Sequence, residues 1–129
     1  MGDAGSGYVG YVLAVLALLA GRENPTGLFV WLILGALFFV DSTVTLVRRV
    51  LRRERVYEAH RSHAYQWLSR HWGSHRAVTL LTIAVNVCWL LPCAWFAARY
   101  PTRAVWIVPI ALLPILVGVI VAGAGRKER

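Results

Sequence analysis

The sequence predicts an all-α protein, a polytopic membrane helix bundle with four transmembrane helices. Of its 129 residues, 58% are hydrophobic and 16% are charged, whereas soluble globular proteins average about 45–50% apolar and about 25% charged residues. The apolar residues gather in four segments, each near the roughly 20 residues that a helix needs to cross about 30 Å of hydrocarbon. This composition argues against a water-soluble enzyme, and also against a disordered basic tail, which would lack the apolar content.

The four predicted spans cover residues 5–20, 27–47, 78–98 and 104–124, and the whole chain 1–129 forms one membrane domain. The first span is not expected to be a cleavable signal peptide, because Asp3 precedes it and no basic residue occurs before Arg22. The second span would measure only about 21 Å if it stopped at Val40. We therefore expect its helix to continue through Asp41 or to break there.

The connecting segments predict the orientation. Two short turns at 22–26 and 99–103 hold three arginines, whereas the loop 48–77 and the tail 126–129 hold the other eleven basic residues. A basic excess marks the cytoplasmic side of a membrane protein. We therefore predict an N-in, C-in topology, with a basic cytoplasmic loop between the second and third helices.

The first group of polar residues is Met1-Gly2-Asp3-Ala4-Gly5-Ser6-Gly7, directly before and within the start of the first span. Asp3 and Ser6 are good helix N-cap types, and a helix N-terminus offers free N–H groups to an anion. A carboxylate there suits Mg²⁺, which prefers oxygen ligands and bridges to substrate phosphates. The alternative is that Asp3 only caps the helix.

The second group surrounds Asp41 in the segment FFVDSTVTLVRR. Thr45 and Arg48 follow at i+4 and i+7 and share a helical side with Asp41. A carboxylate inside a membrane segment is a functional candidate. Pairing with an arginine of a neighbouring helix explains it equally well.

The third group is the loop RRVLRRERVYEAHRSHAYQWLSRHWGSHR, which holds eight arginines and all four histidines. His60 and His63 are spaced to share a helix face, with Arg61 between them. An Arg/His cluster suits phosphate or pyrophosphate, but a basic helix that binds anionic lipid head groups fits the composition too. Zinc is a weaker alternative because no cysteine accompanies the histidines. We expect no nucleic-acid partner, since a loop held at both ends by membrane spans is better placed for lipid substrates.

These three groups, in this order, resemble the C-terminal part of the polyprenyl-phosphate N-acetylhexosamine-1-phosphate transferases. This superfamily (glycosyltransferase family 4) includes the phospho-MurNAc-pentapeptide translocase and the enzymes that start O-antigen and related surface glycans, and the chain looks closest to that second branch. MGDAGS is similar to the catalytic-aspartate motif of the family, and FVDSTVTLVRR to the helix before its last large cytoplasmic loop. AHRSHAYQ occupies the place of the histidine motif in that loop.

The resemblance implies a helix bundle in the bacterial inner membrane, with its active site at the cytoplasmic face. It implies transfer of a sugar-1-phosphate from a UDP-sugar to polyprenyl phosphate, with release of UMP and a requirement for Mg²⁺. Asp3 matches the metal-binding catalytic aspartate, and His60 and His63 match histidines that contact substrate. From their chemistry, Arg61 and Ser6 are candidates for binding substrate phosphate. Asp41 and Arg48 are further candidates whose role the resemblance does not assign.

Two departures from the family pattern stand out. The common histidine motif is His-x-His-His, whereas this chain has His60-Arg61-Ser62-His63. Family members also have about twice as many spans, with a pair of adjacent aspartates in their N-terminal half. We therefore expect the chain to be the C-terminal half of a transferase, with the missing N-terminal half as its partner. The alternative is a non-catalytic membrane protein whose arginine-rich loop binds anionic lipid or a partner subunit.

Overall fold

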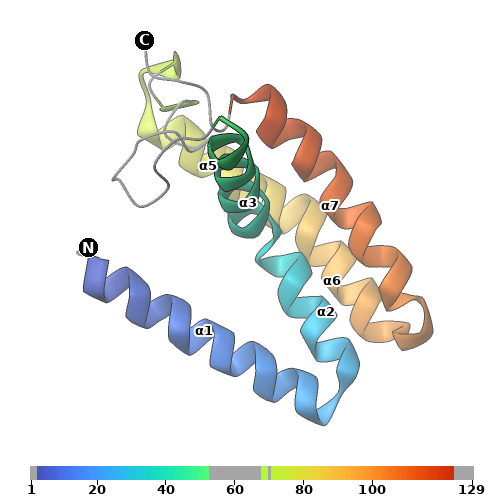
Figure 1. The fold of residues 1–129 in the computed structure, drawn as a ribbon. Helices are drawn as coiled ribbons and strands as arrows, with labels where there is room; N and C mark the ends of the chain where they lie inside the picture. Colours follow the sequence, from blue (N-terminus) through green and yellow to red (C-terminus); the bar gives the residue numbers. More distant parts are fainter. Residues whose placement is uncertain (1–2, 53–67, 70, 124–129) are drawn as a thin grey trace.

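The computed structural model describes residues 3–52, 68–69 and 71–123, and the regular elements within them are all helical. In chain order these are α1 (Asp3–Glu23), α2 (Pro25–Leu34), α3 (Ala36–Leu51), α5 (His75–Val85), η1 (Asn86–Leu90), α6 (Leu91–Arg99), η2 (Pro101–Arg103) and α7 (Ala104–Val121) (Figure 1). The predicted all-helical class is confirmed for this part of the chain.

Both predicted turns are short, as their proline content indicates. Asn24 separates α1 from α2, and its side-chain oxygen accepts a hydrogen bond of 3.0 Å from the backbone N–H of Thr26. Pro25 fills the first position of α2, where a helix loses no hydrogen bond to proline. The second turn consists of Tyr100 and the single 3₁₀ turn η2. Each turn therefore reverses the chain within a few residues.

The described residues contain two helices long and apolar enough to cross a membrane. One is the continuous helix His75–Arg99, formed by α5, η1 and α6, and the other is Pro101–Val121. A third candidate arises if α2 and α3 together form one span. The first predicted span lies within the 21-residue helix α1, but its crossing of the membrane, and so the count of four spans, stays a prediction.

The second predicted span is bent. The axes of α2 and α3 differ by 71° at Gly35, which lies between them. The sequence left two alternatives, that the helix continues through Asp41 or that it breaks there. The helix α3 continues through Asp41, and the bend lies at Gly35, six residues before it. A Cβ atom on Gly35 would lie 2.5 Å from Cε2 of Phe39, so the glycine leaves room for this ring at the bend.

The third span contains one π-helical turn, η1. Pro92 has no N–H and cannot bond the carbonyl of Cys88 four residues before it. Instead, the N–H of Leu91 bonds the carbonyl of Asn86, five residues before it. Such turns widen a helix locally and often occur at functional sites. The wider turn directly precedes Pro92.

Small side chains line the helix contacts in the core. Ala94 and Ala97 of α6 and Ala104 and Ala111 of α7 are at most 3% exposed, and they pack with Ile33 of α2. Small residues let helix backbones approach closely, which is how membrane helices gain dispersion energy. The contacts place α2 against α1, α6 and α7, and α3 along α7.

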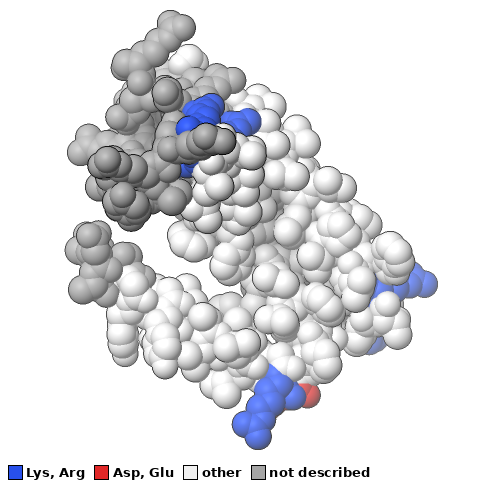
Figure 2. Space-filling view, in the orientation of Figure 1, with Lys and Arg blue, Asp and Glu red and all other residues white. Residues whose placement is uncertain are grey.

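Charge is confined to the ends of the helices on the face drawn in Figure 2. Blue Lys and Arg atoms gather at the two ends of the bundle, and the white surface between them carries none. This surface is strongly apolar, with many large hydrophobic side chains exposed on α6 and α7. The distribution is the one expected for helices that cross hydrocarbon.

Candidate functional site

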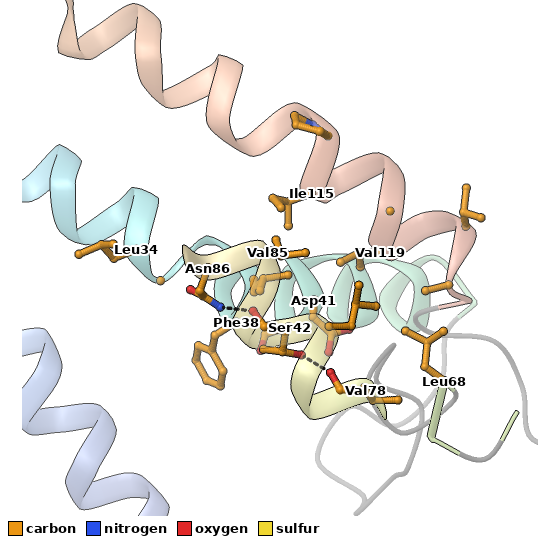
Figure 3. A pocket seen from close by; sticks show the side chains of 18 of the residues that line it. Leu34, Phe38, Asp41, Ser42, Leu68, Val78, Val85, Asn86, Ile115 and Val119 are labelled. Atoms are coloured by element: carbon orange, nitrogen blue, oxygen red, sulfur yellow. Dashed lines mark hydrogen bonds between the residues drawn. The ribbon is translucent and has the colours of Figure 1, made fainter. Parts of the chain in front are cut away.

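A pocket of about 830 Å³ lies beside the bent helix pair α2 and α3. Its walls come from the Gly35 bend and α3, from α5 and η1, and from the C-terminal half of α7 (Figure 3). Leu68 and Trp72, at the end of the basic loop, complete one side. Among the described residues that line it, most are apolar, and polar side chains come from Asp41, Ser42, Thr82 and Asn86. Such a site suits an apolar ligand that carries a few hydrogen-bonding groups.

The bend at Gly35 and the π turn η1 together shape this pocket. The bend directs α3 away from the axis of α2, so α3 lies along α7. The π turn places Asn86 on the opposite wall, and Pro114 of α7 lies on the third side. Pro114 also lacks the backbone N–H that would donate a hydrogen bond to the carbonyl of Ile110. The neighbouring carbonyl of Ala111 accepts a hydrogen bond of 3.1 Å from the indole N–H of Trp89, which ties η1 to α7.

Asp41 is the acidic side chain among the described residues that line the pocket. Its Oδ1 accepts a hydrogen bond of 3.4 Å from the hydroxyl of Thr45, one helical turn further along α3. Asp41 is half-buried, whereas Thr45 is only 1% exposed. The Asp41–Thr45 pair confirms the predicted shared side of the helix. A buried hydroxyl that donates to a carboxylate restricts its rotation and stabilises its charge.

Asn86 faces the same pocket from η1, as Figure 3 shows. Its side-chain amide donates a hydrogen bond of 2.9 Å to the carbonyl of Thr82. The sequence reasoning missed this residue, although an amide near the middle of an apolar 21-residue run is a visible signal. Trp72 and Ser42 were also missed, because their contribution depends on how three separate helices meet.

The C-terminal turn of α3 is basic. Arg48 and Arg49 lie in that turn and Arg52 caps it, a position where the helix dipole favours positive charge. Arg49 is only 6% exposed and Arg48 is half-buried. Arg48 lies seven residues after Asp41, which is about 10 Å along a helix axis. The pocket wall formed by α3 therefore continues into a cationic end.

The other predicted site residues are not placed by the structure. Asp3 and Ser6 lie in α1, but their side chains are outside the described part. His60, Arg61 and His63 fall in the segment 53–67, which also lies outside the described residues. The roles that the family resemblance implies for Asp3, His60 and His63 therefore stay predictions.

A metal site is likewise not defined. Among the described side chains, no group of three or more His, Cys, Asp or Glu residues is arranged to hold a metal ion. Asp41, which lies at the pocket wall, accepts a hydrogen bond from Thr45. The assignment of Mg²⁺ to Asp3 thus rests on the chemistry of the carboxylate and on the family resemblance.

The comparison with known proteins points to the predicted enzyme class. A Bacillus subtilis protein described as a "Probable undecaprenyl-phosphate N-acetylglucosaminyl 1-phosphate transferase" is 32% identical to this chain over 89 residues. This chain is similar to that transferase. The match covers 67% of the chain but 25% of the relative, so the chain spans about a quarter of the relative's length. No family model matches the sequence, and no solved structure does.

Proposed function

We propose that this chain is part of a polyprenyl-phosphate sugar-1-phosphate transferase. The similarity to the Bacillus subtilis transferase, over two thirds of this chain, carries the proposal. The all-helical fold and its apolar spans agree with an enzyme whose acceptor is a membrane lipid. The same enzyme class is implied by the motifs MGDAGS, FVDSTVTLVRR and AHRSHAYQ, which resemble motifs of the polyprenyl-phosphate N-acetylhexosamine-1-phosphate transferases.

In the proposed reaction the donor is a UDP-sugar of the N-acetylhexosamine type. A phosphate oxygen of polyprenyl phosphate forms a new P–O bond to the sugar-bearing phosphorus, while the diphosphate bond of the donor breaks. The products are a polyprenyl-diphosphate-linked sugar and UMP. Phosphoryl transfer of this kind depends mostly on positioning and on neutralisation of charge. Mg²⁺ held by Asp3 would supply part of that neutralisation.

The geometry of the described residues supports a lipid acceptor. The pocket beside α3 is mostly apolar, and its volume of about 830 Å³ is large enough to hold part of an isoprenoid chain. At the end of α3, Arg48 and Arg49 provide guanidinium groups of the kind that bind phosphate with two parallel hydrogen bonds. We propose that the chain of the acceptor lies along α3 and that its phosphate lies at this basic end.

The catalytic assignment can be tested in a complete transferase that contains this chain. Asp3→Asn and His63→Ala should each abolish UMP release and leave the amount of membrane-inserted protein unchanged. Glu23→Gln, at the other end of α1, and His71→Ala, in the same loop as His63, are matched controls that should keep normal turnover. Normal UMP release by both Asp3→Asn and His63→Ala would show that the assignment is wrong.

The non-catalytic alternative makes the opposite prediction. If the basic loop only binds anionic lipid, Asp3→Asn should have no effect on any measured property. Neutralising Arg48, Arg49 and Arg52 together should then abolish binding to vesicles that contain phosphatidylglycerol. In the transferase, the same triple substitution should lower UMP release mainly through a higher KM for polyprenyl phosphate.

A further inference from the structure

The turn between α6 and α7 joins two helices that can each cross a membrane. Tyr100 separates the helix His75–Arg99 from the helix Pro101–Val121, and both are long and apolar enough to span the hydrocarbon. When two consecutive helices cross a bilayer, the turn between them lies at one of its surfaces, whichever way the chain is inserted. The head groups of one leaflet therefore surround this turn.

Two exposed arginines flank the turn. Arg99 is the last residue of α6, and Arg103 directly precedes α7. The backbone N–H of Tyr100 bonds the carbonyl of Phe96, and the backbone N–H of Arg103 bonds the carbonyl of Tyr100, each at 2.9 Å. These bonds hold the two arginines in one closed turn. The sequence from 59 to 127 contains no acidic residue, and the blue atoms at this end of α6 and α7 lie apart from the red atoms in Figure 2.

Aromatic rings connect this cationic turn to the apolar part of the helices. The guanidinium of Arg103 lies over the ring of Tyr100, 5.9 Å from its centroid. Tyr100 stacks on Phe96 with their centroids 6.4 Å apart, and Phe96 meets Trp95 edge-on at 5.1 Å. Trp106, in the first turn of α7, is 71% exposed. Exposed tryptophan and tyrosine rings favour the boundary between hydrocarbon and head groups, so these rings hold the arginines at the depth of the lipid phosphates.

The charge of the turn selects among lipids. A guanidinium that lies over a ring keeps N–H groups at its edge for another acceptor, and a phosphate can accept two of them in parallel. Basic residues near a membrane surface attract anionic lipids. We propose that Arg99 and Arg103 bind the phosphate of an anionic phospholipid, such as phosphatidylglycerol, in the leaflet at this end of the bundle. The site lies at the opposite end of the helix His75–Arg99 from the basic loop, and it does not depend on the proposed reaction.

A fluorescent label beside the two arginines tests the proposal. The full chain, with Cys88→Ser, Cys93→Ala and Thr102→Cys, is labelled with bimane at residue 102 and placed in phosphatidylcholine nanodiscs. Phosphatidylglycerol or phosphatidylcholine that carries a nitroxide near the top of its acyl chain is then included at the same mole fraction. Quenching of the bimane by each lipid gives the ratio of their binding constants at the turn.

We expect this ratio to favour phosphatidylglycerol about fivefold, and the double substitution Arg99→Gln and Arg103→Gln to bring it close to one. Arg22→Gln, which neutralises the exposed arginine at the end of α1, is the matched control and should keep the original ratio. Each single glutamine substitution should give an intermediate ratio, and these variants provide the test if the double variant inserts poorly.

Three results would overturn the proposal. The first is equal quenching by the two lipids in the original chain, and the second is a preference that survives the double substitution. The third is an equal loss of the preference in Arg22→Gln, which would assign it to the overall charge of the protein rather than to this turn.

Discussion

The side chains of Asp41 and Thr45 form a polar pair within a helix that packs in an apolar bundle. The Thr45 hydroxyl is almost fully buried, and the Asp41 carboxylate lies at the wall of the pocket. A carboxylate is costly beside hydrocarbon, so its hydrogen bond matters more there than at a surface. The pair therefore contributes to how Asp41 is presented to a ligand in the pocket.

Thr45→Val removes the hydroxyl donor and keeps the side-chain volume. We expect it to lower the free energy of unfolding by about 1 kcal/mol, measured by SDS titration of the protein in mixed micelles. Thr45→Ser keeps the hydroxyl and loses a methyl group, so it should retain the hydrogen bond. If Thr45→Val were as stable as the original chain while Thr45→Ser were destabilised, the methyl group rather than the hydrogen bond would matter.

At the scale of the elements, two glycines are expected to respond differently to the same substitution. Gly27→Ala places a Cβ atom 2.6 Å from a backbone oxygen of Ala20, so α1 and α2 must move apart. Gly35→Ala meets the ring of Phe39, which is 47% exposed and can rotate away. We expect Gly27→Ala to destabilise the protein by about 1–3 kcal/mol and Gly35→Ala to change stability by less than about 1 kcal/mol.

The measurement is the same SDS titration, with Gly118→Ala as a control whose Cβ meets nothing within 4 Å. A larger loss for Gly35→Ala than for Gly27→Ala would contradict this prediction. It would mean that the bend itself, rather than the helix contact, is the sensitive feature.

The hydrogen bond between η1 and α7 gives a further prediction at this scale. Trp89→Phe removes the indole N–H that donates to the Ala111 carbonyl. Hydrogen bonds between membrane helices contribute about 0.6 kcal/mol on average and at most about 1.7 kcal/mol. We expect a loss in that range, with Trp95→Phe as a control, because that indole packs edge-on against Phe96 of its own helix. Equal losses for both variants would indicate that the bond adds nothing beyond ring packing.

The helices could be predicted from the sequence, but their irregularities could not. The apolar runs and the Asn24-Pro25 and Tyr100-Pro101 turns set where helices begin and end. Gly35 gives no sign of a bend, because a glycine in an apolar run serves equally well for close packing. The π turn at 86–90 follows from Pro92 only once neighbouring helices hold the backbone in place.

At the scale of the whole molecule, the sequence named Asp41 as a candidate but gave no sign of the pocket walls around it. Asp41 was named because a carboxylate in an apolar run is rare and costly. Asn86, Trp72 and Pro114 line the same pocket as Asp41 because segments far apart in the sequence pack together. Their contribution depends on the fold, whereas that of Asp41 is visible from its type and position alone.

The charge distribution predicts the orientation of the whole molecule in the membrane, and this orientation can be measured. Eleven of the 14 basic residues lie in the segments 48–77 and 126–129, so these segments should face the cytoplasm. The helix His75–Arg99 separates His71 from Thr102, and its 25 residues span about 37 Å, enough to cross the hydrocarbon. In a chain with Cys88→Ser and Cys93→Ala, a membrane-impermeant maleimide should label Thr102→Cys in intact bacterial spheroplasts. It should label His71→Cys only after the membrane is permeabilised. Labelling of both cysteines from the outer side would mean that this helix does not cross the membrane, and the reverse pattern would invert the predicted topology.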